Sequence, residues 1–286
     1  MPTTYTHYRF GQEVLAGLNP EVSRPILQYK ELFDAGLHGP DLLFYYHALT
    51  GSDVIRLGNR LHHKSGLFFF SHMAGEIKTM AQPGPSLAYL YGFLCHFALD
   101  RRCHAYIEPF IEESGVSHFE IEAEQDRYYL QRDGKNPFRQ KLTGHIVPSL
   151  KNARVMAPFF DWTADLIETK PDEEPLRITP EIMRTAMKSF RLYLNILVCR
   201  SRLKRNTLLK LLEMVGHKEF ADLIIHENPN PACEKSNQDM DQLYALSVTD
   251  AVRLIEDYVP CLKGEKPWDE IYNYNFEGEE VAAEGE

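Results

Sequence analysis

Apolar side chains recur every three or four residues through most of the chain, the spacing that places them on one face of a helix. Start signals support several segments: Asn19 precedes Pro20, Ser86 follows a Pro-Gly-Pro break, and Thr179 precedes Pro180. We expect helices over residues 11–18, 19–36, 56–63, 68–80, 86–110, 117–131, 138–144, 148–168, 179–205, 206–215, 218–225 and 249–259. No stretch alternates apolar and polar residues for long enough to indicate a strand. The pattern therefore predicts an all-α fold, a single multi-helix bundle.

Composition agrees with one globular unit. The chain has 286 residues, of which 44% are hydrophobic and 25% charged, close to average globular usage. No linker and no internal repeat interrupts the helical pattern. We expect one helical domain over residues 1–275 and an acidic, disordered tail over residues 276–286.

Charge and cysteine content exclude several classes of protein. The formal net charge is -10, which argues against a nucleic-acid partner, because a grip on the phosphate backbone needs clustered Lys and Arg. The five cysteines form no CxxC pair and are odd in number, so a disulfide framework is not expected. The first residues lack the features of a signal peptide, and no apolar run predicts a transmembrane segment. A cytoplasmic location is the expectation that follows.

Histidines and carboxylates gather in the middle of the chain at helical spacing. His96, Asp100 and His104 are four residues apart, and His118 and Glu122 repeat that spacing on the next predicted helix. Residues four apart lie one turn apart on the same helix face. Imidazole nitrogen and carboxylate oxygen are ligands that zinc accepts, and helix bundles build metal sites from facing helices. The spacing therefore indicates a metal site.

A plainer interpretation competes with the metal site. A single His/Asp pair at this spacing is most often an exposed polar pair, and a lone histidine on an apolar face is usually a core residue. Here the pairs lie close together in sequence, and Leu90, Leu94 and Phe97 indicate that the first helix is largely buried. Buried charge without a partner or metal is costly. On spacing alone the two interpretations are about equally supported.

Upstream residues add candidates. Asp41 lies in a loop beside apolar residues, where a carboxylate is commonly a helix cap. His62 and His63 are adjacent and point in different directions, so at most one of them is expected to bind. His7 lies near the N-terminus. The histidines without a spacing partner are interpreted as structural or surface residues: His38, His47, His72, His145, His217 and His226.

In this order, the residues resemble the zinc-dependent phospholipase C family, which shares its fold with single-strand nucleases of the S1/P1 type. That family has a His-xxx-Asp helix, a further histidine, and then His-xxx-Glu on the next helix. Here these are His96, Asp100, His104, His118 and Glu122. An earlier aspartate, an earlier histidine and an N-terminal histidine complete the family pattern. The resemblance covers roughly residues 5 to 130.

The resemblance implies how the residues divide among two or three zinc ions. The first zinc would be held by Asp41, His62 (or His63), His96 and Asp100. The second would be held by His104, His118 and Glu122. The third would be held by His7 and by Asp100 as a bridging ligand. The family's third zinc also uses an N-terminal tryptophan, which this chain lacks.

The same resemblance implies that the chain is a metal-dependent phosphoric ester hydrolase like phospholipase C. A zinc-bound water would attack phosphorus, and Asp41 would orient or deprotonate that water. The partner would be a phosphodiester substrate, with phospholipid as one candidate. Arg101 and Arg102 follow Asp100 and could contact a phosphate, although such residues are more often salt-bridge partners. Two alternatives stay open: a single-strand nuclease or nucleotidase on the same fold, and a non-catalytic zinc-stabilised protein.

Overall fold

Helices follow one another from end to end of the chain. The computed structural model describes residues 4–167, 174–199, 201–214, 216, 218–226 and 228–281. The elements are α1 (Thr4–Gly17), α2 (Pro20–Gln28), α3 (Lys30–Gly36), η1 (Gly39–Tyr45), α4 (Asp53–His62), α5 (Gly66–Thr79), α6 (Gly84–Ser114), α7 (His118–Arg132), α8 (Leu150–Asp161), η2 (Ala164–Leu166), α9 (Pro180–Leu197), α10 (Arg202–Met214), η3 (Lys218–Ala221), η4 (Pro231–Cys233), α11 (Glu234–Lys263) and η5 (Glu270–Asn273), where η marks a 3-10 helix. Within the described ranges, the strand-like pairing is limited to one isolated bridge between Tyr274 and Glu280. The predicted all-α fold is confirmed.

Several predicted boundaries are wrong for identifiable reasons. Residues 138–144 form turns instead of a helix, because the segment is short and lies between Pro137 and Gly144, and a helix that short needs packing or caps to form. The helix expected over residues 179–205 ends at Leu197, where the extended Val198 turns the chain. The helix expected over residues 249–259 is the end of the much longer α11. The first helix begins at Thr4, well before residue 11.

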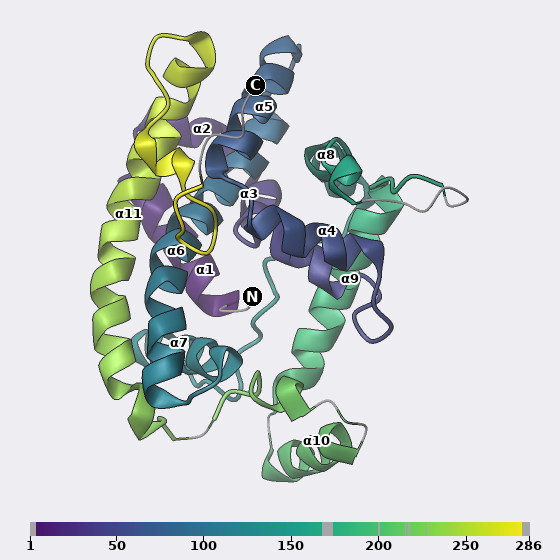
Figure 1. Cartoon of the computed structure of the whole chain (residues 1–286), viewed down its shortest axis with the longest axis vertical. Helices are drawn as coiled ribbons and strands as arrows, with labels where there is room; N and C mark the ends of the chain where they lie inside the picture. The colour runs from purple at the N-terminus through teal and green to yellow at the C-terminus, as the bar shows by residue number, and fades with distance from the viewer. Residues whose placement is uncertain are drawn as a thin grey trace.

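The long helix α6 lies along the middle of the molecule, with α11 beside it (Figure 1). Pro85 stands in the first turn of α6, and Gly115 ends the helix in the left-handed conformation. Every residue from Ala88 to Asp100 is buried. A helix that is buried all round must satisfy any polar side chain inside the protein. The polar residues of α6 are therefore the first place to look for chemistry.

Two glycines let α3 cross α6 closely. A Cβ atom added to Gly92 of α6 would lie 2.1 Å from the carbonyl oxygen of Phe33, and one added to Gly36 would lie 2.2 Å from that of Tyr89. Such distances are far inside van der Waals contact, so only glycine fits at either position. The close crossing brings η1, which follows α3 directly, against α6.

The C-terminal segment packs onto the core instead of leaving it. Phe276 is 2% exposed, and its N–H donates to the carbonyl of His62 over 3.1 Å. The N–H of Val281 donates to the carbonyl of Asn273. The tail boundary expected at residue 276 is therefore too early, because the aromatic side chain of Phe276 fills a place in the core. Residues 282–286 of that expected tail lie outside the described residues.

Two further properties bear on the environment of the protein. Cys95, Cys103, Cys199, Cys233 and Cys261 are all buried and none forms a disulfide. Among the described helices, none is both long and apolar enough to cross a bilayer.

Candidate metal centre

Three groups of buried histidines and carboxylates meet beside α6. His96, Asp100 and His104 occupy successive turns of this helix and are 0%, 3% and 4% exposed. Their i, i+4 spacing points them to one side. That side faces α1, η1, α4 and α7, which supply the other members of the three groups.

The first group joins Asp41, His62 and His96. Nε2 of His62 lies 3.1 Å from Oδ1 of Asp41, and Nε2 of His96 lies 3.9 Å from the same oxygen. Nδ1 of His62 donates to the carbonyl of Gly58 over 2.8 Å. A neutral imidazole that donates from Nδ1 carries its lone pair on Nε2. The backbone of α4 therefore turns the metal-binding nitrogen of His62 towards the group.

His62 is the member of the His62–His63 pair that enters the cluster. His62 ends α4 and is buried, whereas His63 is the exposed C-cap residue of that helix. The phenyl ring of Phe44 stacks on His62, and the ring of Phe276 packs against both His62 and His96. Tertiary packing decides which of the two histidines enters the cluster. The sequence does not reveal it, because the two residues are adjacent.

The second group joins His7, His96 and Asp100. Oδ1 of Asp100 lies 3.1 Å from Nε2 of His7, and Oδ2 lies 3.0 Å from Nε2 of His96. Nevertheless, neither Nε2 of His96 nor Oδ2 of Asp100 has a hydrogen-bond partner among the described residues, although both atoms are buried. Buried polar atoms without a hydrogen bond are costly. A cation between them would satisfy both atoms at once.

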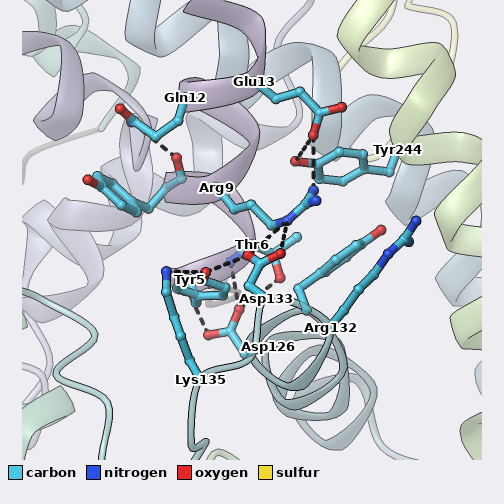
Figure 2. Close-up of polar contacts among 12 residues, drawn as sticks. Tyr5, Thr6, Arg9, Gln12, Glu13, Asp126, Arg132, Asp133, Lys135 and Tyr244 are labelled. Carbon is cyan, nitrogen blue, oxygen red and sulfur yellow. Dashed lines mark hydrogen bonds and ion pairs between the residues drawn. The ribbon is translucent and has the colours of Figure 1, made fainter. Parts of the chain in front are cut away.

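Asp126 of α7 fixes the start of α1 and with it the position of His7. Oδ2 of Asp126 accepts a hydrogen bond from the N–H of Tyr5 over 3.0 Å, and Oδ1 accepts from the N–H and the hydroxyl of Thr6, each over 2.8 Å (Figure 2). A carboxylate beside the first turn satisfies helix N–H groups that have no partner within the helix. Burial, opposed by these hydrogen bonds, raises the pKa of Asp126 to about 7.

The third group joins His104, His118 and Glu122. Ser117 caps α7 by accepting from the N–H of Glu120, which places His118 in the first turn. Oε1 of Glu122 lies 3.2 Å from Nε2 of His118 and 3.6 Å from Nε2 of His104. The two Nε2 atoms and the carboxylate oxygen therefore converge on one point, as three ligands of a zinc ion would.

Glu277 joins this group from the far end of the chain. Its Oε2 lies 3.6 Å from Nδ1 of His104, the ring nitrogen on the opposite side from Glu122. A carboxylate on the second nitrogen of a metal-binding histidine orients the ring and raises its basicity. Glu277 is not among the ligand residues that the sequence predicts, because residues 276–286 are expected to form a disordered tail. The signal was the aromatic series Trp268, Tyr272 and Phe276 just before it, which indicates packing.

The carboxylates of the cluster carry lowered pKa values. Burial opposes ionisation of Asp41, but nearby positive charge, including that of His96, and the hydrogen bond with His62 outweigh burial and lower its pKa to about 2. Burial likewise opposes ionisation of Asp100 and Glu122, but the imidazoles that face Asp100, and nearby positive charge that includes His118 at Glu122, hold both pKa values well below the usual range. The carboxylates of Asp41, Asp100 and Glu122 are therefore anionic at neutral pH.

Two histidines show the matching effect. Burial alone would lower the pKa of His62, but Asp41 outweighs it and raises that pKa; in the same way Glu122 raises the pKa of His118. The cluster thus stabilises positive charge among side chains that are largely buried. Divalent cations supply such charge without protons, and the N/O ligand set fits zinc.

The structure brings all the expected ligand residues except His63 into the three groups. It groups Asp100 with His7 and His96, while the first group consists of Asp41, His62 and His96. His96 is thus shared between two groups, and Asp100 lies one helical turn further along α6.

The neighbouring basic residues and the remaining histidines form contacts outside the three groups. Arg101 and Arg102 both pair with Asp250 of α11, over 2.9 and 2.6 Å, so they are salt-bridge partners. His38 and His145 approach each other with their Nε2 atoms 2.7 Å apart, a contact across 107 residues that spacing cannot reveal. His72 stacks on Trp162, and His226 lies 2.8 Å from a guanidinium nitrogen of Arg205. His217 lies outside the described residues.

Comparisons with known proteins agree with this geometry. The model of the family described as "Zinc dependent phospholipase C" matches residues 6–173, more than half of the chain. No curated protein and no solved structure matches the chain. The matched range contains all three groups of histidines and carboxylates, with Glu277 outside it. The chain belongs to the zinc-dependent phospholipase C family.

Proposed function

We propose that this protein hydrolyses a phosphodiester bond at the cluster formed by η1, α1, α4, α6 and α7. The observation that carries the proposal is the pair of buried atoms Nε2 of His96 and Oδ2 of Asp100, which lie 3.0 Å apart without a hydrogen bond. An ion that completes the site explains buried polar atoms in this state. The charge of the cluster and the zinc dependence of the family support the same conclusion.

Each group would hold one ion. Asp41, His62 and His96 would hold the first, with His104, His118 and Glu122 holding the second. A third ion would lie at His7 and Asp100, next to the first. Zinc bound there would supply water of lowered pKa and positive charge for the phosphoryl oxygens.

Among the residues of the chain, Asp41 is the candidate for orienting the attacking water. Its pKa of about 2 keeps it ionised at every working pH, so it accepts a hydrogen bond throughout. The same low pKa makes it a weak base, which favours orientation of the water over removal of its proton. Nε2 of His62 lies 3.1 Å from Oδ1 of Asp41, so the two residues would bind the same ion, which would fix Asp41 in place.

The first test combines metal analysis with a substrate panel. Purified full-length protein is analysed for zinc by elemental analysis as wild type, as Asp100→Asn and as Glu112→Gln. Glu112 is an exposed carboxylate further along the same helix, so its variant controls for loss of charge from α6. We expect zinc in the wild type and in Glu112→Gln, and at least one ion fewer in Asp100→Asn.

The panel contains a 4-nitrophenyl phosphodiester, phosphatidylcholine and single-stranded DNA. Hydrolysis of the first two with loss of activity in Asp100→Asn supports the proposal. Cleavage of DNA alone would assign the site to a nuclease. Bound zinc without hydrolysis of any of the three would make the cluster structural, with melting on chelation as its signature. Wild-type protein without zinc would refute the metal centre itself.

A further inference from the structure

A large cavity opens directly onto the metal centre. It has a volume of about 660 Å³, within the range of about 300–1,000 Å³ that is common for small-molecule sites. His62, His104 and His118 form part of its lining, and Glu277 lies at the same end. A molecule in this cavity would therefore adjoin two of the three histidine and carboxylate groups.

Helices outside the family match build the opposite wall. Tyr193 and Ile196 come from α9, Leu208 and Leu212 from α10, and Phe220 from η3. The match ends at residue 173, so these residues lie outside the matched range. In Figure 1, α9 and α10 lie across the molecule from α11.

Helix α10 is unusual in what it leaves uncovered. It is described throughout and contains no buried residue, although Leu208 and Leu212 are one turn apart on one face, and that face lines the cavity. A soluble helix normally buries its apolar face against another element. Here the face meets a cavity, which indicates that a ligand covers it.

The chemistry of the lining limits what this ligand is. The described residues around the cavity include no lysine and no arginine, so the wall offers no countercharge for a polynucleotide. Apart from the end that carries the histidines and Glu277, the lining is almost entirely aliphatic and aromatic. An apolar wall of this length excludes a polar group and favours hydrocarbon.

The rim of the cavity is apolar as well. Leu49 and Ile196 belong to the lining and are 60% and 41% exposed. Leu203, Leu211 and Met214 on the outer side of α10 are 78%, 47% and 76% exposed. Exposed apolar side chains at the mouth of a cavity favour an apolar ligand. A chain entering the cavity would pass over Leu49 and Ile196, which belong to the lining.

We propose that the cavity encloses a hydrocarbon chain of the substrate, with its phosphodiester at the histidine end and its chain along α9 and α10. This inference rests on the proposed phosphodiester hydrolysis. It adds that the protein selects its substrate by chain length, through the C-terminal helices. The substrate is accordingly an amphiphile whose chain leaves its aggregate and enters the protein.

Chain length gives a direct test. The zinc-loaded full chain is assayed with alkyl 4-nitrophenyl phosphates of one to fourteen carbons, each below its micelle threshold. We expect kcat/KM to rise by up to about fourfold per added methylene until the cavity is full, and then to level off. Binding of alkylphosphonates of the same lengths, measured by calorimetry, provides a readout that needs no turnover.

Adjacent leucines on α10 provide matched variants. Leu212→Gln places a polar group in the wall and is expected to lower the ratio of dodecyl to methyl kcat/KM about tenfold. Leu211→Gln makes the same change on the next residue, which is 47% exposed and lies outside the lining, and should leave the series unchanged. Leu212→Trp fills the cavity and should shorten the chain length at which kcat/KM levels off. Since α10 buries no residue, these variants are expected to fold, which thermal melts verify.

The outcomes separate this inference from the proposed function. Hydrolysis of all esters at one rate, whatever their length, would overturn the enclosed chain and leave the hydrolase intact. Phosphonate affinity that rises with length, without hydrolysis of any ester, would support the cavity and refute the hydrolase. Activity that appears only with micelles or phosphatidylcholine vesicles would show that the α9–α10 surface binds aggregates and would overturn enclosure. If the wild type is a dimer that Leu212→Gln dissociates, the surface binds a second copy of the chain, and the enclosed hydrocarbon chain is overturned.

Discussion

Replacing Glu277 with glutamine tests whether the C-terminal segment belongs to the metal centre. Glutamine keeps the size of the side chain and removes its charge. Oε2 of Glu277 faces Nδ1 of His104 at 3.6 Å, and Nδ1 has no hydrogen-bond partner in the described part of the chain. The amide is a weaker acceptor, so the imidazole of His104 becomes less basic and less firmly oriented.

The structure sets the size of the effect. Loss of a carboxylate behind a metal-binding histidine typically weakens metal affinity by about 10–100-fold. The side chain of Glu277 is 28% exposed, so water screens part of its charge, and 3.6 Å is long for a hydrogen bond. Both facts place the effect near the lower end, a loss of about tenfold in zinc affinity, or about 1.4 kcal/mol. The loss should be confined to the ion held by His104, His118 and Glu122.

Competition against a chromophoric chelator measures zinc affinity at each site. Glu280→Gln is the matched control, because it removes the same charge from an exposed position of the same segment. The melting temperature of the zinc-free protein should be the same for both variants, which distinguishes weakened ligation from weakened folding. Wild-type affinity in Glu277→Gln, or an equal loss in Glu280→Gln, would refute a role for Glu277 at His104.

Three further outcomes follow from the geometry. Gly92→Ala places Cβ 2.1 Å from the carbonyl oxygen of Phe33 and should lower the free energy of unfolding, measured in urea, by about 1–3 kcal/mol. Gly75→Ala, with no atom within 4 Å of the added Cβ, should be neutral or stabilising. Equal effects of the two variants would contradict the close crossing of α3 and α6. In the zinc-free protein, the raised pKa values of His62 and His118 contribute stability. This contribution is complete below about pH 6.5 and is lost as the pH rises through the pKa values of the folded state. Thermal melts in the presence of a chelator should therefore show a melting temperature that falls from pH 6 to 8. Zinc requires neutral imidazoles, so the stabilisation that added zinc provides should grow over the same interval, and a parallel fall with and without zinc would count against ligation by these residues. Asp126→Ala removes the acceptor of the first N–H groups of α1 and should raise proteolysis at the N-terminus and release the ion held near His7, as limited digestion and elemental analysis would show; full zinc content would separate the anchor from the site.

Local geometry explains why so much of the cluster was predictable. Residues four apart on a helix face the same way in any fold, so His96, Asp100 and His104 on α6 and the His118–Glu122 pair on α7 could be read from spacing. The helical class followed from the same periodicity. The predicted ends of helices were poorer, because a cap such as Asp126 lies more than a hundred residues from the helix that it starts.

What the amino-acid order determined by itself was the helical class and the ligand pairs within single helices, since both depend on contacts between residues a turn or two apart. Tertiary packing alone decided that His62 enters the cluster and His63 does not, that Glu277 reaches His104, and that α9 and α10 stand over a cavity. Each of these joins segments far apart in the chain. Their meeting depends on how whole helices approach one another, as at Gly36 and Gly92, and no repeating spacing in the sequence records that approach.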